Sequence, residues 1–362
     1  MEKSLMYYGD YLYLDTLLTS QHPVSFSKNY TPAHDEMLFI ITHQTYELWF
    51  KQILFELDYV IQVFGKEKIN DNSEDLNLVR HRLNRVIRIL ELVNQQVNIM
   101  ETMTPLDFLE FRNLLTPSSG FQSKQFRLIE AKLGLEMGKR HQYDYYKKVK
   151  EGGFTRKDYD DITETENNEN ILQRINRWLE RMPFFEERFW LGYTPVTGAG
   201  TDADNFWRDY REIYHASLTE REKGKIHDFD YVFFERTNHT YTLEQLDTLR
   251  GSFSSKALRA ALFIMLYRDF PVFQTSYQIL DSLIEIDNML SNWRYRHYIM
   301  VRRMIGLRVG TGNTSGAGYL EGALSKHHVY KDLAGLSTYL IERRNLPALP
   351  RELVNHLSFA GY

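Results

Sequence analysis

The chain contains no cysteine in its 362 residues. This absence excludes disulfides, thiolate-bound metals and a cysteine nucleophile, so any metal must be held by His, carboxylate, Tyr or Met side chains. The first residues, MEKSLMYYGD, lack the apolar run of a signal peptide. No stretch approaches the about 18 uncharged apolar residues of a membrane span. We therefore expect a soluble, cytosolic protein.

The chain also lacks an excess of basic residues. It carries 44 Lys+Arg against 48 Asp+Glu, a formal net charge of −4 and a pI near 6.3, which argues against a dedicated nucleic-acid binder. Hydrophobic residues make up 43% and charged residues 25%, as in an ordinary globular protein. We expect one domain over residues 1–362, with a less regular middle region at about 140–245.

Proline is scarce, at 9 residues in the whole chain, and this favours helices. Residues 35–64 contain neither proline nor glycine and predict one helix of about 45 Å. A second helix is predicted by a stripe of apolar residues spaced alternately by three and four. The stripe consists of Leu76, Val79, Leu83, Val86, Leu90, Val93, Val97 and Met100.

Clear boundary signals mark two further helices. Thr104, Pro105 and Asp107 predict a helix start with a capping box, and this helix should end before Pro117. A long helix should follow Pro271, on a stripe with the same alternating spacing. Its members are Ile279, Leu283, Ile286, Leu290, Trp293, His297, Met300 and Met304.

The remaining segments are less regular. We expect helices near 171–181, 204–218 and 256–267, and a surface excursion without an apolar stripe at about 150–170. The segment GLRVGTGNTSGAG, from Gly306, places five glycines in thirteen residues, too many for a regular element. It is not a Walker loop, and its glycines either let the backbone approach a small ligand or form a loop.

Two histidines lie among apolar residues of the predicted long helices. His43 shares a helix face with Phe39 and Phe50, and His297 lies on the apolar stripe of the last long helix. A buried imidazole needs a hydrogen bond or a metal, and taken singly each is more often a satisfied core histidine. Two such helices across an aromatic-lined space are also suited to a flat macrocycle, with one imidazole binding its iron.

Other polar residues have two readings each. Arg112 follows Phe108 by one helical turn, so it is either a surface arginine or a carboxylate-binding one. The pairs His34 with His43 and His327 with His328 leave a zinc site open, although no HExxH motif accompanies them. The run Arg80, His81, Arg82, Arg85 and Arg88 is either a phosphate-binding patch or a solvated helix face.

Several long strings resemble the tryptophan 2,3-dioxygenase family, in the same order, from about Tyr7 to Arg343. They are YYGDYLYLDTLL, HDEMLFIITHQTYELWFKQILFELD, ETMTPLDFLEFRNLLTPSSGFQSKQFRLIE, NWRYRHYIMVRRMIGLRVGTG and LSTYLIERR. The resemblance is faint from about 140 to 240. It implies an all-α fold, a long-helix bundle that encloses a haem b pocket, with extra helices in a middle insertion. It also implies a homotetramer that adds both atoms of O₂ to the indole ring of L-tryptophan and gives N-formylkynurenine.

The resemblance assigns roles on the haem side of the pocket. His297 in WRYRH corresponds to the axial ligand of the haem iron. His43 in FIITHQ corresponds to the catalytic residue on the opposite side, which hydrogen-bonds the indole N–H. Phe39 packs beside substrate and haem, and Ser119 in PSSGFQS lies near the haem edge.

The other transferred residues bind the amino acid. Arg112 corresponds to the residue that binds the substrate carboxylate, and Thr311 in GTG to the one that binds its ammonium and carboxylate groups. Phe108 forms a wall of the indole pocket, and Tyr8 and Tyr11 reach the pocket of a neighbouring subunit. One position departs from the family pattern: where the family reads GTGG, Gly312 is here followed by Asn313. The alternatives are a haem monooxygenase acting on an indole or modified tryptophan, a haem or tryptophan sensor without turnover, and a helical assembly protein.

Overall fold

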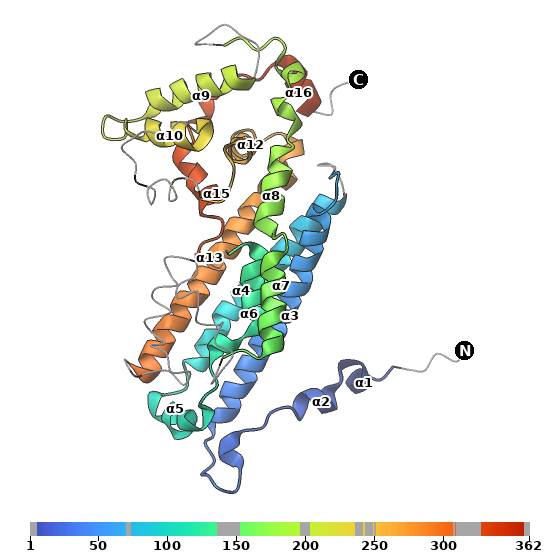
Figure 1. Ribbon diagram of the computed structural model, residues 1–362, viewed down its shortest axis with the longest axis vertical. Coiled ribbons are helices and arrows are strands. Elements are labelled where there is room, and N and C mark those ends of the chain that lie inside the picture. Colours follow the sequence, from blue (N-terminus) through green and yellow to red (C-terminus); the bar gives the residue numbers. More distant parts are fainter. Residues whose placement is uncertain are drawn as a thin grey trace, which may run out of the picture.

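The frame of the molecule is a bundle of three long helices. The computed structural model describes residues 6–69, 74–135, 153–195, 203–235, 242, 249, 251–306, 308 and 327–357. Helices α3 (Asp35–Phe64), α4 (Glu74–Met100) and α13 (Pro271–Ile305) run side by side along its long axis (Figure 1). The described residues form helices and no strand, which confirms the all-α prediction.

Shorter helices pack around this frame (Figure 1). At and beside its lower half lie α5 (Pro105–Phe111), α6 (Lys124–Leu133) and α7 (Arg156–Asn167). Towards the opposite end lie α8 (Ile171–Glu180), α9 (Ala203–Ser217), α10 (Lys225–Phe234), α12 (Ser255–Leu266), α15 (Lys331–Gly335) and α16 (Arg351–Leu357). Short 3-10 helices are η1 (Val24–Phe26), η2 (Arg112–Leu115), η3 (Gly120–Gln122), η6 (Pro183–Phe185), η7 (Glu187–Trp190), η8 (Leu336–Tyr339) and η9 (Arg343–Asn345).

The predicted apolar stripes form the core of the bundle. Every residue of the stripe on α4 is buried, from Leu76 to Met100. On α13 the stripe is buried except at Trp293 and His297, which are only partly buried. These two residues border a cavity. The two partly buried positions on α13 therefore show where the cavity meets the core.

Local signals fix the ends of α5 and α13. Asp107 N–H donates to Thr104 Oγ1 at 3.3 Å and Thr104 N–H donates to Asp107 Oδ2 at 2.8 Å, which confirms the capping box. Helix α13 ends at Gly306, whose φ of +59° is in the region that favours glycine. Apart from Gly306 and Arg308, the glycine-rich segment lies outside the described residues.

The prediction of an excursion at 150–170 was wrong for most of this segment. Helix α7 begins there, with Thr155 as its cap: its side chain accepts a hydrogen bond from Asp158 N–H at 3.2 Å. Ile162 is fully buried and packs with Phe154 against Leu128 of α6. Only one residue of this twelve-residue helix is fully buried, and most of the others are polar, so the sequence shows no apolar stripe.

The basic run on α4 lies mostly on an exposed face, and its arginines pair with carboxylates of the same chain. Arg85 Nη1 lies 2.8 Å and Arg82 Nε 3.5 Å from the buried carboxylate of Glu56 on α3. Arg88 pairs with Glu91 at 2.7 Å. These pairs favour a structural role over a phosphate-binding patch.

The N-terminal segment leads away from the bundle (Figure 1). Helices α1 (Tyr8–Leu12) and α2 (Leu14–Leu18) contain no buried residue. Tyr8 is 71% and Tyr11 65% exposed in the described part of the chain. Among the described helices, none combines the length and apolarity needed to cross a bilayer.

Candidate functional site

A cavity of about 420 Å³ lies among α3, α4, α6 and α13, and residues of α5, η2 and η3 also line it. This size falls within the about 300–1,000 Å³ typical of small-molecule and cofactor sites. The aromatic residues of its wall are Phe39, Tyr46, Phe50, Phe108, Phe126 and Trp293. Aliphatic and thioether side chains add to this apolar surface: Val97, Met100, Leu115 and Met300.

His297 contributes its imidazole to this wall from α13. Its Nδ1 is buried and has no hydrogen-bond partner among the described residues. Two effects lower the pKa of His297 to about 4: burial is the larger, and electrostatic repulsion by His43 is the smaller. The ring is therefore neutral near pH 7, which is the protonation state a metal requires of histidine.

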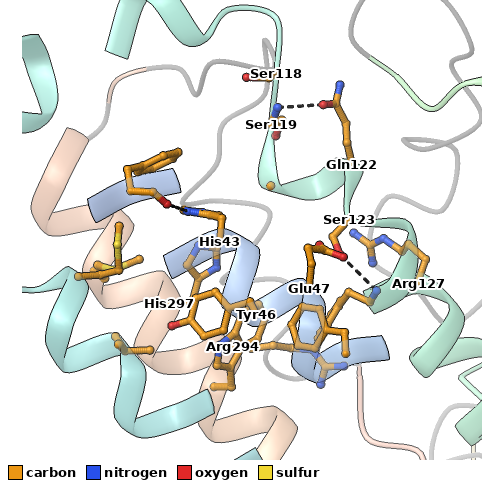
Figure 2. A pocket seen from close by; sticks show the side chains of 18 of the residues that line it. His43, Tyr46, Glu47, Ser118, Ser119, Gln122, Ser123, Arg127, Arg294 and His297 are labelled. Carbon is orange, nitrogen blue, oxygen red and sulfur yellow. Dashed lines mark hydrogen bonds between the residues drawn. The ribbon is translucent and has the colours of Figure 1, made fainter. Parts of the chain in front are cut away.

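His43 contributes the second imidazole from α3, and Figure 2 shows it with His297 in the same cavity wall. Its Nδ1 lies 2.7 Å from the carbonyl oxygen of Phe39. Burial lowers the pKa of His43, so this ring is also neutral. Because a carbonyl oxygen only accepts, Nδ1 carries the proton and Nε2 is an acceptor.

Phe39 adjoins His43 and in turn contacts Phe108. The ring of Phe39 lies 4.1 Å from that of His43, and Phe108 of α5 stacks on Phe39 at 5.9 Å between centroids. Both phenylalanines line the cavity. These rings form an apolar wall beside the Nε2 acceptor.

Ser119 also lines the cavity, on the turn before η3. Its backbone N–H donates to Gln122 Oε1 at 3.1 Å, a bond drawn in Figure 2. Ser118, Gln122 and Ser123 lie on the same wall. This side of the cavity is polar, opposite in character to the phenylalanine side.

The remaining predicted residues are not in the described cavity wall. Arg112 follows α5 as the first residue of η2 and is partly buried, but it does not line the cavity. Thr311 and Asn313 lie outside the described residues. Tyr8 and Tyr11 are on the exposed N-terminal segment. The structure thus brings together five of the nine predicted site residues: Phe39, His43, Phe108, Ser119 and His297.

A buried charged cluster in the wall was missed from the sequence. Glu130 Oε2 lies 2.8 Å from Arg127 Nη1, and Glu130 Oε1 lies 2.9 Å from Arg294 Nη2. His327 Nδ1 lies 3.4 Å from the same carboxylate, and burial lowers the pKa of His327. All four side chains are at most 7% exposed. Helical spacing predicts contacts only between residues a few positions apart, so it could not predict a contact between α6 and residues more than 160 positions later.

The zinc alternatives find no support in the described part of the chain. No group of three or more His, Cys, Asp or Glu side chains is arranged there to hold a metal ion. His327 is instead paired with Glu130, and His328 Nδ1 lies 4.0 Å from Asp287. A metal at His297 would need most of its ligands from a cofactor, because a single imidazole does not hold an ion.

The comparisons with known proteins identify the family of the chain. The family model described as tryptophan 2,3-dioxygenase matches residues 1–340. The chain is 40% identical to proteins named tryptophan 2,3-dioxygenase from Bdellovibrio bacteriovorus, over 98% of both chains, and from Mayetiola destructor, over 98% of this chain and 90% of the relative. One from Dictyostelium discoideum is also 40% identical, over 98% of this chain and 88% of the relative. The chain belongs to the tryptophan 2,3-dioxygenase family.

Proposed function

We propose that the protein is a haem-dependent dioxygenase that opens the indole ring of L-tryptophan with O₂ and releases N-formylkynurenine. The observation that carries the proposal is one aromatic-lined cavity with a neutral imidazole from α3 and another from α13, in a chain of this family. The indole C2–C3 bond breaks and each carbon gains one oxygen atom. Both atoms of O₂ are thus in the product, and no further reductant is consumed.

The residues of the cavity fit haem b. Its apolar wall suits the face of a porphyrin, and the neutral imidazole of His297 lies in that wall. We assign His297 as the residue that would hold the haem iron. A lone histidine suffices here because the porphyrin supplies four nitrogen ligands. When bound, haem supplies the O₂ chemistry, and the polypeptide supplies orientation and exclusion of water.

His43 orients the substrate in this proposal. Its Nε2 accepts a hydrogen bond from the indole N–H, because its own proton is held at Nδ1 by the Phe39 carbonyl. Phe39 and Phe108 pack against the flat indole ring. The ring is thereby held in one orientation, which lowers the entropy cost of reaction.

Arg112 and Thr311 are proposed to bind the amino-acid end of the substrate. The assignment rests on their motifs, DFLEFR and GTG. A guanidinium forms two parallel hydrogen bonds with a carboxylate, which suits Arg112 to this task. Ser119 is proposed to lie at the haem edge, on the polar side of the cavity.

An oligomer fits the exposed apolar surface of the described chain. Tyr8 and Tyr11 lie on the N-terminal segment, and Ile41, Leu48 and Phe55 form an exposed row at seven-residue spacing on α3. Such surface is characteristic of subunit interfaces. We propose a homotetramer in which the N-terminal tyrosines reach the pocket of a neighbouring subunit. Sedimentation equilibrium tests the stoichiometry, and a stable monomer at micromolar concentration would contradict it.

One experiment separates the proposed activity from its alternatives. The haem-loaded protein is reduced without oxygen, its spectrum is recorded with and without L-tryptophan, air is admitted, and the product mass is measured. We expect a gain of two oxygen atoms. A gain of one indicates the monooxygenase, a tryptophan-dependent Soret shift without product indicates a sensor, and a protein that takes up no haem contradicts the proposal.

A further inference from the structure

Trp293 stacks on His297 within α13. It lies one helical turn earlier, and the two ring centroids are 5.2 Å apart with an angle of 18° between the planes. Both side chains line the cavity. A flat neighbour in this position restricts rotation of the imidazole about its Cβ–Cγ bond, because turning the ring would drive its edge into the indole.

The indole of Trp293 is itself fixed by aromatic residues of two other helices. Its ring lies 5.0 Å from Phe126 of α6, and 6.1 Å from both Tyr46 and Phe50 of α3. The last two contacts are edge-to-face, at 82° and 87°. Contacts from several directions leave the indole little freedom to tilt. Because its plane is fixed, it can restrain the imidazole that stacks on it.

No hydrogen bond within the described residues performs this task. Metal-binding histidines generally donate their second ring N–H to a carboxylate, a carbonyl or water, and this bond sets the orientation of the ring. Nδ1 of His297 is buried and has no such partner in the described chain. Packing against Trp293 is therefore the contact that remains to set the ring plane.

We propose that Trp293 is a positioning residue that sets the plane of the His297 imidazole by ring stacking, in place of the usual hydrogen bond. The inference rests on the proposed function, because it takes His297 as the ligand of the haem iron. It adds to that function a residue that acts through His297. A flat side chain at position 293 is then required for a single orientation of the ligand.

The test is resonance Raman spectroscopy of the haem-loaded ferrous protein, with the iron–histidine stretching band as readout. Trp293→Phe keeps a flat ring, whereas Trp293→Met keeps much of the volume without one. We expect the band of Trp293→Phe to match that of the unmodified protein, and the band of Trp293→Met to broaden or shift. Haem transfer to apomyoglobin should be about 10- to 100-fold faster from Trp293→Met, the range found when support of a metal ligand is lost.

A matched control separates positioning from general destabilisation. Phe263→Leu removes a buried aromatic ring that does not line the cavity, and its band should be unchanged. If Trp293→Met does not fold, Phe126→Leu loosens the indole instead and should broaden the band. If the iron–histidine band is unaltered in Trp293→Met, or in Phe126→Leu when that variant is used instead, the inference is wrong. A missing band in the unmodified protein would instead refute the ligand assignment of the proposed function.

Discussion

The Nδ1 atom of His43 donates a hydrogen bond to the carbonyl oxygen of Phe39, 2.7 Å away and one helical turn earlier. This bond fixes both the tautomer and the orientation of the ring, and it leaves Nε2 as an acceptor in the cavity wall. A fixed acceptor beside two phenylalanine rings matches an indole, which is apolar except for its N–H. The acceptor that we propose for the indole N–H is therefore held in place by a bond within helix α3.

His43→Ala should reduce kcat/KM for L-tryptophan by about 10- to 100-fold, because one hydrogen bond in a buried site contributes about 1–3 kcal/mol. The same variant should have little effect on turnover of 1-methyl-L-tryptophan, which has no indole N–H to donate. Steady-state kinetics with both substrates measure the difference. Equal losses for the two substrates would mean that His43 does not bind the indole nitrogen.

His297→Ala should purify without haem, because the variant removes the only axial ligand proposed for the iron. Its absorbance spectrum should lack the Soret band while its helical circular dichroism is retained. Added imidazole should restore part of the haem binding, since the ring then enters the space that the side chain left. A variant that keeps a normally ligated haem without imidazole contradicts the assignment.

Arg112→Ala should chiefly raise the KM for L-tryptophan, by about 10-fold or more, because a charge-assisted hydrogen bond contributes about 1.5–3 kcal/mol. Tryptamine has no carboxylate, so its weaker turnover should be the same with and without Arg112. The ratio of kcat/KM between the two substrates is the measurement. If Arg112→Ala affects both substrates equally, the residue does not bind the carboxylate.

The haem-free protein should lose stability as the pH falls from about 6.5 to about 4. In this window the unfolded chain protonates His297, whose ordinary pKa is 6.5, while the folded chain does not, because burial lowers the pKa to about 4. The free energy of unfolding should decrease by about 3 kcal/mol from this group. Urea unfolding at several pH values measures the decrease, and His297→Phe should show a shallower dependence. Parallel curves for the two proteins would contradict the prediction.

Glu130→Gln should destabilise the protein by about 3–5 kcal/mol, because it leaves Arg127 and Arg294 buried around an uncharged partner. A large fall in the thermal midpoint is the expected result. Glu91→Gln provides the comparison, since Glu91 pairs with the exposed Arg88 on the surface of α4. Its midpoint should not change measurably, and similar falls in both variants would show that burial of the Glu130 cluster is unimportant.

The long helices were predictable because their signals are local. The alternating spacing from Leu76 to Met100 and the Thr104 capping box depend only on neighbouring residues, and both were confirmed. His43 and His297 were found from their place on apolar faces, and the structure puts both in one cavity wall. The sequence missed α7, where Ile162 is the one buried residue and packs near Leu128 of α6.

The charged part of the site was not predictable from spacing. Glu130 and Arg294 are 164 positions apart, and only the packing of α6 against α13 brings them to 2.9 Å. On the sequence, Arg294 is one of many arginines between apolar positions. Trp293 was read as a member of an apolar stripe, and its stacking on His297 required the side-chain geometry.

The Glu130 cluster affects whether the cavity keeps its shape in the haem-free protein. Alkyl side chains around a void can slide inward and close it, but a carboxylate held between two guanidinium groups cannot leave its partners without a large electrostatic penalty. The ion pairs of the Glu130 cluster therefore hold one side of the cavity in place. We therefore expect the haem-free chain to keep the space that the proposed porphyrin would occupy.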